Sequence, residues 1–322
     1  MAVPGNNTQG RWIGTDEAGL GPNLGPLVVS ATAWHLPVAP QKIDLYDVLS
    51  GAVDRDSTQG GTRLWVADSK RVYSPGRGLR TLETSALALL GQTGPIPKTW
   101  DALSHQLTGR PLAATEGEPW LRDRVLELPL VADGDHIERM TDQLRRTCEM
   151  AGVQVAALRS DLVETPRFNT ECDQTNSKGV VLSRTTLRLL EEVWPDDGVT
   201  TLAICDKHGG RNQYAPLLSE AFGDLFIPRL EESAERSRYS LRSGEVRFQV
   251  RAEEYLPTAA ASILSKYLRE LSMELLNQFW QSYQPGLKST KGYPEDARRF
   301  RADIAVTQAA LGVSDQVLWR RR

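Results

Sequence analysis

The sequence has 322 residues, of which 40% are hydrophobic and 25% are charged, and this balance is typical of a globular protein with a sizeable core. No apolar run approaches the roughly twenty residues that a membrane-spanning helix needs, so we expect no membrane partner. The net charge of −3 excludes a general basic field, so a polyanionic partner would have to meet local basic patches, such as Arg236 to Arg238 and Arg320 to Arg322.

The first residues, Met1 to Thr8, contain neither a basic leader nor an apolar segment, which predicts no secretory signal and a cytoplasmic location. The cysteines Cys148, Cys172 and Cys205 have no C-x-x-C spacing. This argues against a disulfide framework or a zinc ribbon, and we expect reduced thiols in packed positions.

The first predicted elements are two strands, over residues 11–17 and 26–34, joined by a turn rich in Gly and Pro. The ranges 35–63 and 92–120 lose periodicity and predict surface loops or insertions. Between them, the leucine spacing after Asp68-Ser69-Lys70 predicts a helix that runs to Leu90.

A β-α-β passage is predicted next. Residues 125–131 and 152–158 have the composition of strands, and an amphipathic helix is expected between them over 137–150. Pro129 would confine the first of these strands to a sheet edge. Ser183 is then expected to cap a helix that stops at Pro195.

The last third of the chain predicts two strands and a helical end. The run 200–205 is apolar throughout, as in a strand buried on both faces, and it delivers Asp206 to its C-terminal end. Residues 246–250 alternate as in a half-exposed strand that ends near Glu253 and Glu254. A helix opens at Thr258, and a loop with one or two helices is expected after Tyr293.

Carboxylates therefore stand at three predicted strand ends, in Asp16-Glu17, Asp206 and Glu253-Glu254. Carboxylates gathered in one place repel one another unless hard cations neutralise them, and two Mg²⁺ ions are the usual solution for displacement at a phosphate. We therefore predict Mg²⁺ or Mn²⁺ as the cofactor. Because successive strand residues face opposite ways, Asp16 and Glu17 can share a site only if the strand bends or ends there, which Gly19 and Gly21 favour.

Two other interpretations of this stretch remain. Acidic residues beside glycines also cap helices or solvate loops. The glycines from Gly19 to Gly25 could form a dinucleotide-binding loop, but Pro22 removes an N–H that should face phosphate, and the turn leads into a strand rather than a helix.

Four segments in chain order resemble one known family. They are Asp16 to Pro22 with Gly25 to Val29, Asp68 to Lys70, Arg251 to Glu253 with Ala260 to Lys266, and Lys291 to Tyr293. These are similar to the D-E-A-G-R-G-P with G-P-V-V, the D-S-K, the K-A-D/E with A-A-S-I-x-A-K, and the K-G-Y elements of the type 2 ribonucleases H, RNase HII and HIII.

The resemblance implies an α/β, ribonuclease H-like fold, in which a mixed central β-sheet is flanked by helices. It implies a two-metal endonuclease that cleaves the RNA strand of RNA/DNA hybrids. The matching catalytic and metal-binding residues are Asp16, Glu17, Asp206 and Glu253, with Glu254 in reserve.

The same resemblance suggests substrate-binding residues. Backbone groups of Gly19, Leu20 and Gly21 would contact the ribose 2′-hydroxyl, the group that separates RNA from DNA. Tyr293 would lie against the sugar or base beside the cut, unless it is a plain loop tyrosine. Lys70 and Lys266 could contact phosphates.

The chain also departs from the family pattern. Leu20 replaces the Arg between the two glycines, which removes a cation near the substrate. Lys207-His208-Gly209-Gly210-Arg211 replaces a short Asp-Gly turn, and Lys207 and Arg211 could compensate for the lost charge. We interpret His208 as a turn histidine rather than a proton shuttle or ligand. The stretch from Gly91 to Phe168 has no counterpart in the family.

We therefore predict a divergent enzyme with a catalytic domain over residues 9–275, carrying surface insertions, and a C-terminal helical extension over 276–322. Its expected partner is an RNA/DNA hybrid or DNA that contains ribonucleotides, with no obligate protein partner. A structure-selective DNA nuclease on the same fold and a catalytically silent hybrid-binding protein are the alternatives.

Overall fold

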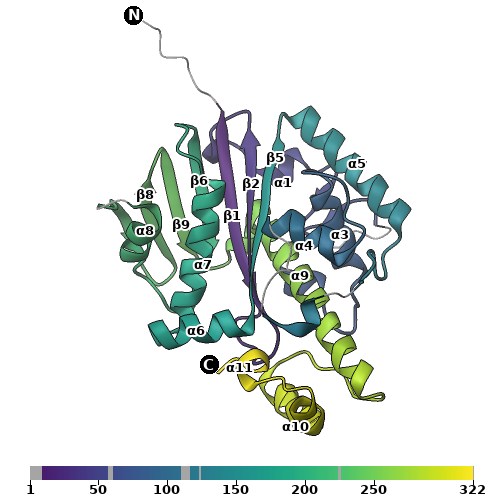
Figure 1. Cartoon of the computed structure of the whole chain (residues 1–322). Helices are drawn as coiled ribbons and strands as arrows, with labels where there is room; N and C mark the ends of the chain where they lie inside the picture. Colours follow the sequence, from purple (N-terminus) through teal and green to yellow (C-terminus); the bar gives the residue numbers. More distant parts are fainter. Residues whose placement is uncertain (1–8, 57–60, 110–116, 123–124, 224–225, 322) are drawn as a thin grey trace, which may run out of the picture.

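The centre of the structure is a mixed β-sheet of seven strands in the order β5-β2-β1-β6-β9-β8-β7 (Figure 1). The computed structural model describes residues 9–56, 61–109, 117–122, 125–223 and 226–321. The strands of this sheet are β1 (Gly10–Ala18), β2 (Leu27–Leu36), β5 (Gln154–Val163), β6 (Thr200–Asp206), β7 (Arg229–Glu232), β8 (Arg236–Leu241) and β9 (Gly244–Gln249). A separate parallel pair joins β3 (Val53–Asp54) to β4 (Leu64–Trp65).

The three central strands β1, β6 and β9 run in the same direction. β1 pairs in parallel with β6, and β6 pairs in parallel with β9, whereas β2, β5, β7 and β8 are joined through antiparallel ladders. The C-terminal ends of the three parallel strands therefore meet at one edge of the sheet, the lower edge in Figure 1.

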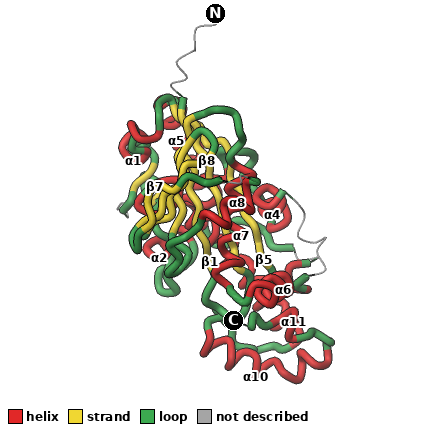
Figure 2. The backbone as a smooth tube through the Cα atoms, turned by 90° about the vertical axis from the view of Figure 1, so that its left-hand side faces the viewer, coloured by secondary structure: helices red, strands yellow, loops and turns green. Residues whose placement is uncertain are grey.

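Helices cover the sheet and extend beyond it. They are α1 (Leu45–Val48), α2 (Ser69–Val72), α3 (Arg80–Leu90), α4 (Trp100–Thr108), α5 (Gly134–Ala151), α6 (Thr165–Thr175), α7 (Lys178–Val193), α8 (Ala215–Phe222), α9 (Leu256–Tyr283), α10 (Pro294–Ala310) and α11 (Asp315–Leu318), with the 3-10 turns η1 (Pro40–Lys42), η3 (Pro119–Leu121) and η4 (Ala252–Glu254). Seen from the side, α6, α10 and α11 lie below the lower edge of the sheet (Figure 2).

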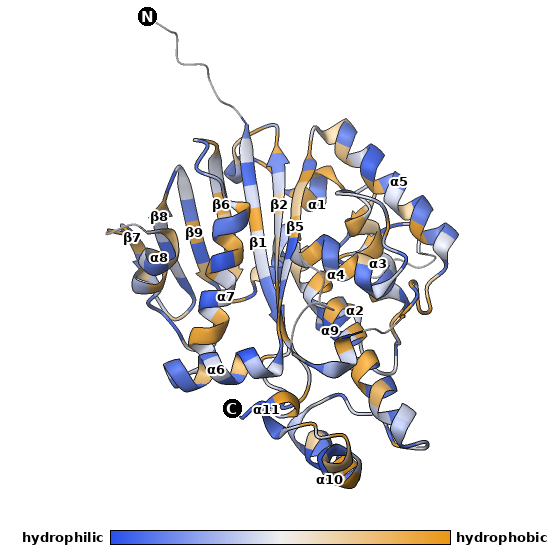
Figure 3. Ribbon diagram, viewed as in Figure 1, coloured by the Kyte–Doolittle hydropathy of each residue, from blue (hydrophilic) through white to orange (hydrophobic). Residues whose placement is uncertain are grey.

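Each face of the sheet buries its own hydrophobic cluster. Trp12 and Ile204 face the cluster that contains α9, and the alternate residues Ile13 and Ala203 face the cluster that contains α7. Hydrophobic and hydrophilic residues alternate around α5 and α7, as expected of helices with one buried side (Figure 3), whereas α9 is buried around most of its surface. The predicted mixed sheet flanked by helices is thus confirmed.

Helix α9 lies very close to the central strand because Gly14 has no side chain. A Cβ added at Gly14 would overlap main-chain atoms of Pro257 and Thr258. The hydroxyl of Thr258 also donates a hydrogen bond of 3.1 Å to the carbonyl of Ile204. The start of α9 is therefore fixed to both β1 and β6.

The predicted strand over 125–131 is wrong. Only Glu127 forms a β-bridge there, with Thr99. The N–H groups of Leu130, Val131 and Ala132 instead donate to the carboxylate of Glu83, which is completely buried. The segment therefore makes only a short main-chain contact with residues 98–100, and the expected β-α-β passage does not form.

Three helix predictions also need correction. The helix expected up to Leu90 is split into α2 and α3, because residues 74–78 contain a proline and two glycines. The range 92–120 is not only loop, since Thr99 caps helix α4 through the N–H of Ala102. Ser177, not Ser183, caps α7.

Two further findings concern the whole chain. Helix α9 is continuous through residue 275, where we expected the C-terminal extension to begin, and the division of the chain into 9–275 and 276–322 stays a prediction. Among the helices of the described residues, none combines the length and apolar character needed to cross a bilayer.

Candidate functional site

The ends of β1 and β6 bring three carboxylates together. One oxygen from each of Asp16, Glu17 and Asp206 lies within 4.8 Å of the others. The parallel ladder between β1 and β6 ends at the pair Thr15 and Cys205, so Asp16 and Asp206 are the next residues on neighbouring strands. β1 stays in register with β2 through Glu17 and Ala18, so the strand does not end at Asp16, and one oxygen of Glu17 nevertheless lies near Asp206.

Glu253 lies near the same three carboxylates but belongs to the turn η4 rather than to a strand. After β9 the chain passes through Arg251, which has a φ of 57°, and enters the turn η4. The charge of Glu253 lies close enough to raise the pKa values of Asp16, Glu17 and Asp206. Glu253 is half-buried, whereas Glu254 is exposed. Of the two candidates, Glu253 is thus the one whose charge acts on all three carboxylates of the cluster.

Burial and mutual repulsion raise the pKa values of the three carboxyl groups in the cluster. Burial, together with the charge of Glu17, raises the pKa of Asp16 well above its usual value. Burial and the charge of Asp206 raise the pKa of Glu17 to about 7, and burial and the charge of Glu253 raise the pKa of Asp206 to about 6. A divalent cation would relieve this repulsion, and the carboxylate oxygens are hard donors of the kind that Mg²⁺ and Mn²⁺ prefer. The residues present therefore fit a divalent metal site.

Helix α9 supports Asp16 from below. The hydroxyl of Ser265 donates to the main-chain carbonyl of Asp16 at 3.0 Å, and Ser262 forms a hydrogen bond to its carboxylate that lowers the pKa. Ser262 in turn accepts from the N–H of Ser69 at 3.1 Å. The Asp68 to Lys70 element thus reaches the cluster through the helix.

Lys70 is exposed at the start of α2, where the carboxylate of Asp68 accepts from its N–H at 3.0 Å. Burial acts to lower the pKa of Lys70, but the charges of Asp68, Asp16 and Glu253 outweigh it, so the pKa is raised. Lys70 therefore carries a positive charge beside the cluster. Lys266 forms an ion pair of 2.7 Å with Glu270 instead.

The glycine loop follows Glu17 directly. Gly19 has a φ of 91°, a conformation that favours glycine, and a Cβ added there would lie 2.5 Å from Nε of Arg269. Gly21 is exposed, whereas the side chain of Leu20 packs against the hydrophobic cluster on the α7 side of the sheet. Leu20 is therefore a packing residue in this chain.

Tyr293 lies beside this loop with 53% of its surface exposed. The carbonyl of the preceding Gly292 accepts from the N–H of Asn23 at 2.8 Å, and the guanidinium of Arg269 lies 5.9 Å from the Tyr293 ring. The structure thus places Tyr293 beside the glycine loop, and its contact with a sugar or base stays a prediction.

Lys207 and His208, which follow Asp206, form hydrogen bonds with residues around their own turn. The ammonium group of Lys207 donates to Asn212 and to the carbonyl of Ser233, at 2.7 and 2.6 Å, so its charge is committed to this turn. His208 is buried, and its Nδ1 lies 2.9 Å from the hydroxyl of Ser183. Burial lowers the pKa of His208 to about 3, so the ring is neutral at physiological pH. This is the environment of a packed turn histidine.

Sequence reasoning missed two arginines under the glycine loop. Arg269 and Arg320 have exposed fractions of 1% and 0%. Arg320 belongs to a basic run that has the pattern of a solvated face, and Arg269 lies inside an amphipathic helix. Their roles depend on contacts between distant parts of the chain, so no local pattern could have found them.

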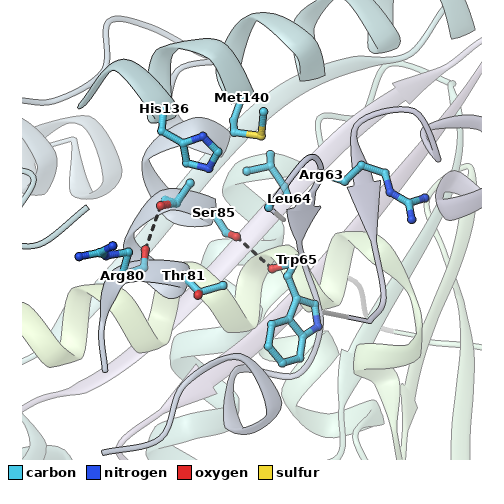
Figure 4. Close-up of a pocket in the computed structure, with 10 residues that line it drawn as sticks. Arg63, Leu64, Trp65, Arg80, Thr81, Ser85, His136 and Met140 are labelled. Atoms are coloured by element: carbon cyan, nitrogen blue, oxygen red, sulfur yellow. Dashed lines mark hydrogen bonds between the residues drawn. The ribbon is translucent and has the colours of Figure 1, made fainter. Parts of the chain in front are cut away.

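A cavity of about 260 Å³ lies elsewhere, between β4, α3 and α5 (Figure 4). Arg63, Trp65, Arg80, His136 and Met140 are among the residues that line it. None of the carboxylates of the cluster contributes to it. The cavity is therefore separate from the candidate metal site.

No protein-family model matches the chain, and no curated protein matches its sequence. Solved structures do match it. Ribonuclease H2 from Pyrococcus horikoshii OT3 is 15% identical, with a TM-score of 0.50, over 96% of this chain and 92% of that one. RNase HII from Archaeoglobus fulgidus, solved in complex with PCNA, is 18% identical, with a TM-score of 0.47, over 96% and 94%. Bst-RNase HIII, solved with Mn²⁺, is 16% identical, with a TM-score of 0.39, over 97% and 66%.

The similarity to the Pyrococcus enzyme extends over nearly the whole chain and shows the fold. The chain has a ribonuclease H-like fold, as the resemblance implied. At this identity the similarity says nothing of activity by itself. The acidic cluster adds an independent observation, because it lies at the carboxyl ends of central strands and fits a divalent metal ion. Fold and cluster together fit a metal-dependent nuclease.

Proposed function

We propose that the protein is a divergent type 2 ribonuclease H. It is a metal-dependent endonuclease that hydrolyses the RNA strand of RNA/DNA hybrids, or ribonucleotides embedded in duplex DNA. The observation that carries this proposal is the convergence of Asp16, Glu17 and Asp206 within 4.8 Å at the end of two parallel strands.

Asp16, Glu17, Asp206 and Glu253 would hold Mg²⁺ or Mn²⁺. Two such ions, when bound, supply the Lewis-acid polarisation of the scissile phosphate and the activation of water that phosphodiester hydrolysis needs. The protein's own contribution is to fix the carboxylates on rigid strand ends, with Ser262 bonded to Asp16 and Lys70 as a nearby positive charge.

The glycine loop would recognise the sugar. Within the described residues, no carbonyl or side chain accepts a hydrogen bond from the N–H groups of Gly19, Leu20 and Gly21, so these donors are available to a ligand. A ribose 2′-hydroxyl next to the cluster is an acceptor that deoxyribose lacks. Tyr293 would pack its exposed ring against the neighbouring sugar or base.

The test is a cleavage assay with three duplexes, which are an RNA/DNA hybrid, DNA with one embedded ribonucleotide, and the same DNA without it. We expect Mg²⁺- or Mn²⁺-dependent cleavage of the first two only. Asp206→Asn should lower the rate by about 100-fold or more, because even indirect partners of metal ligands are worth 10- to 100-fold. Asp197→Asn is the matched control, since Asp197 pairs with Arg11 at the opposite end of β6.

Other outcomes identify the alternatives. Equal cleavage of all three duplexes would make the protein a DNA nuclease on this fold, which is the case that the replacement of Arg by Leu20 favours. Metal-independent binding of the hybrid, without cleavage and unchanged by Asp16→Asn, would make it a silent hybrid-binding protein.

A further inference from the structure

We propose that Arg320 is a positioning residue that sets the conformation of the glycine loop, Gly19 to Pro22, and thereby the selectivity for ribose over deoxyribose. This inference deepens the proposed function and rests on it for the nature of the ligand.

The guanidinium of Arg320 binds three carbonyls of the loop. Its Nη2 donates to the carbonyls of Gly19 and Leu20 at 2.6 and 3.2 Å, and its Nε donates to the carbonyl of Pro22 at 3.0 Å. Nη2 bonds to Pro22 as well. The planar fork of an arginine can serve several acceptors in fixed directions, which a lysine cannot do. The side chain therefore defines the path of the loop.

The hydrogen bonds of Arg320 use the carbonyl groups of the loop and none of its main-chain N–H groups. Because the carbonyls of Gly19 and Leu20 point to the buried guanidinium, the loop is held with its main-chain donors free of protein acceptors in the part of the chain that the structure describes. A loop that flipped one peptide plane would replace a donor by an acceptor on the ligand side. Arg320 opposes such a flip.

The burial of Arg320 argues for a specific role. Its exposed fraction is 0%, and no carboxylate of the described residues forms an ion pair with it. A buried charge without a paired carboxylate is costly, and although the charge of Glu118 acts on Arg320, it forms no ion pair with it. Carbonyl groups of the loop are the partners that compensate it here.

The surrounding residues fix Arg320 from both sides. Its guanidinium lies 4.4 Å from the ring of Phe168. The side-chain amide of Asn169 donates to the carbonyl of Trp319 at 2.9 Å and accepts from the N–H of Arg321 at 3.1 Å. Asn23 donates to the carbonyl of Arg320 at 3.1 Å. The segment that carries Arg320 is thus anchored to α6 and to the loop itself.

The loop sequence fits this arrangement. The side chain of Leu20, which stands where the related motif has Arg, packs against the hydrophobic cluster and offers no polar group to a ligand. In this chain the loop conformation is therefore set by hydrogen bonds from the buried Arg320, which is 300 residues away from Leu20 in the sequence.

The test compares Arg320→Lys with Arg321→Lys. Arg321 is exposed and pairs with Asp173, so its substitution is a control for charge and for position in the chain. Three measurements are made, which are amide hydrogen exchange of residues 19–25, the shift of the melting temperature by Mn²⁺, and cleavage of duplexes with and without one ribonucleotide.

We expect Arg320→Lys to increase amide exchange in the loop by about tenfold or more, because the fork of hydrogen bonds is lost. The Mn²⁺-induced shift should stay as in the unmodified protein, since the carboxylates are on β1 and β6. The preference for the ribonucleotide-containing duplex should fall by about tenfold, because a mobile loop no longer presents its donors. Arg321→Lys should change none of the three.

Unchanged loop exchange or unchanged ribose preference in Arg320→Lys would overturn the proposal. Asn23→Ala provides a second variant that leaves the guanidinium in place and removes one anchor, and it should give a smaller change in the same direction. If the unmodified protein cleaves no duplex, the proposed function fails, while hydrogen exchange still decides whether Arg320 holds the loop.

Discussion

The hydroxyl of Ser262 accepts a hydrogen bond of 3.1 Å from the main-chain N–H of Ser69, which is 193 positions away in the sequence. The same hydroxyl bonds to the carboxylate of Asp16 and lowers its pKa. Ser262 therefore links the start of α2 to α9 at the position where its hydroxyl also bonds to the carboxylate of Asp16.

Ser262→Ala should weaken divalent metal binding. Without the hydroxyl, the charged form of Asp16 loses a hydrogen bond, so its pKa rises further above the usual range. We expect the affinity for Mn²⁺ at pH 7 to fall by about tenfold, measured by calorimetric titration. Ser272→Ala is the control, because Ser272 is also buried on α9 but bonds only to the carbonyl of Leu268. Equal affinities of the two variants would contradict this role of Ser262.

Asp206→Asn should stabilise the metal-free protein at pH 8. The pKa of Asp206 is raised to about 6 in the folded state, so the folded state binds more protons than the unfolded state between about pH 4 and pH 6. The stability contributed by this group is therefore present at low pH and lost as the pH rises through 6. We expect a gain of roughly 1 kcal/mol at pH 8 and less at pH 5, from urea unfolding.

Asp197→Asn should lower the stability of the protein at pH 8, whereas Asp206→Asn raises it. Its hydrogen bonds with Arg11 lower the pKa of Asp197, so its charge stabilises the fold above the unfolded-state pKa. Removing that charge should destabilise the protein at pH 8. If Asp206→Asn and Asp197→Asn changed the free energy of unfolding in the same direction at pH 8, the ionised form of Asp206 would not destabilise the fold as the raised pKa implies.

Metal binding should compete with protons. The pKa of Glu17 is raised to about 7 and that of Asp206 to about 6, so Glu17 is partly protonated near pH 7 and both groups are partly protonated near pH 6. These protons must leave when a cation binds. The apparent affinity for Mg²⁺ should therefore fall on the order of tenfold between pH 8 and pH 6. Calorimetry in two buffers of different ionisation enthalpy would measure the released protons. An affinity that is constant over this range would show that the cluster is not the binding site.

Gly14→Ala should unfold or strongly destabilise the protein. The new Cβ would overlap main-chain atoms of Pro257 and Thr258, which cannot rotate away as a side chain can. We expect a loss of about 3 kcal/mol or more in the free energy of unfolding, measured with urea. Gly76→Ala, where a Cβ meets no atom within 4 Å, should leave stability within about 1 kcal/mol. A mild effect at Gly14 would mean that α9 can move away from β1.

Much of the sheet and of the acidic cluster could be predicted from the sequence. The unbroken apolar run of β6 identifies a strand buried on both faces, and it ends at Asp206 because the run ends there. The order of the four family-like segments brings Asp16, Glu17 and Glu253 into the same hypothesis. The strand follows from local composition, and the grouping of the carboxylates follows from their places at strand ends and from the resemblance to the family.

The remainder depends on contacts that local patterns do not encode. Residues 125–131 look like a strand, but the buried carboxylate of Glu83 accepts from the N–H groups of Leu130, Val131 and Ala132, 47 to 49 positions later in the chain. Ser183 looks like a cap, but α7 already begins at Lys178, and the Ser183 hydroxyl donates to the carbonyl of Gly179. In the first case a tertiary partner overrides a local preference, and in the second Ser177 caps the same helix at an earlier position.

The position of Arg320 has a consequence for synthesis on the ribosome. Asp16 and Glu17 precede β6, α9 and Arg320 in the chain, so they are synthesised before the elements that pack around them. Because domains fold as units during translation, a half-made chain presents acidic residues without a completed centre around them. The acidic cluster therefore cannot be completed before α9 has been synthesised, since Ser265, 249 positions after Asp16, donates to the Asp16 carbonyl.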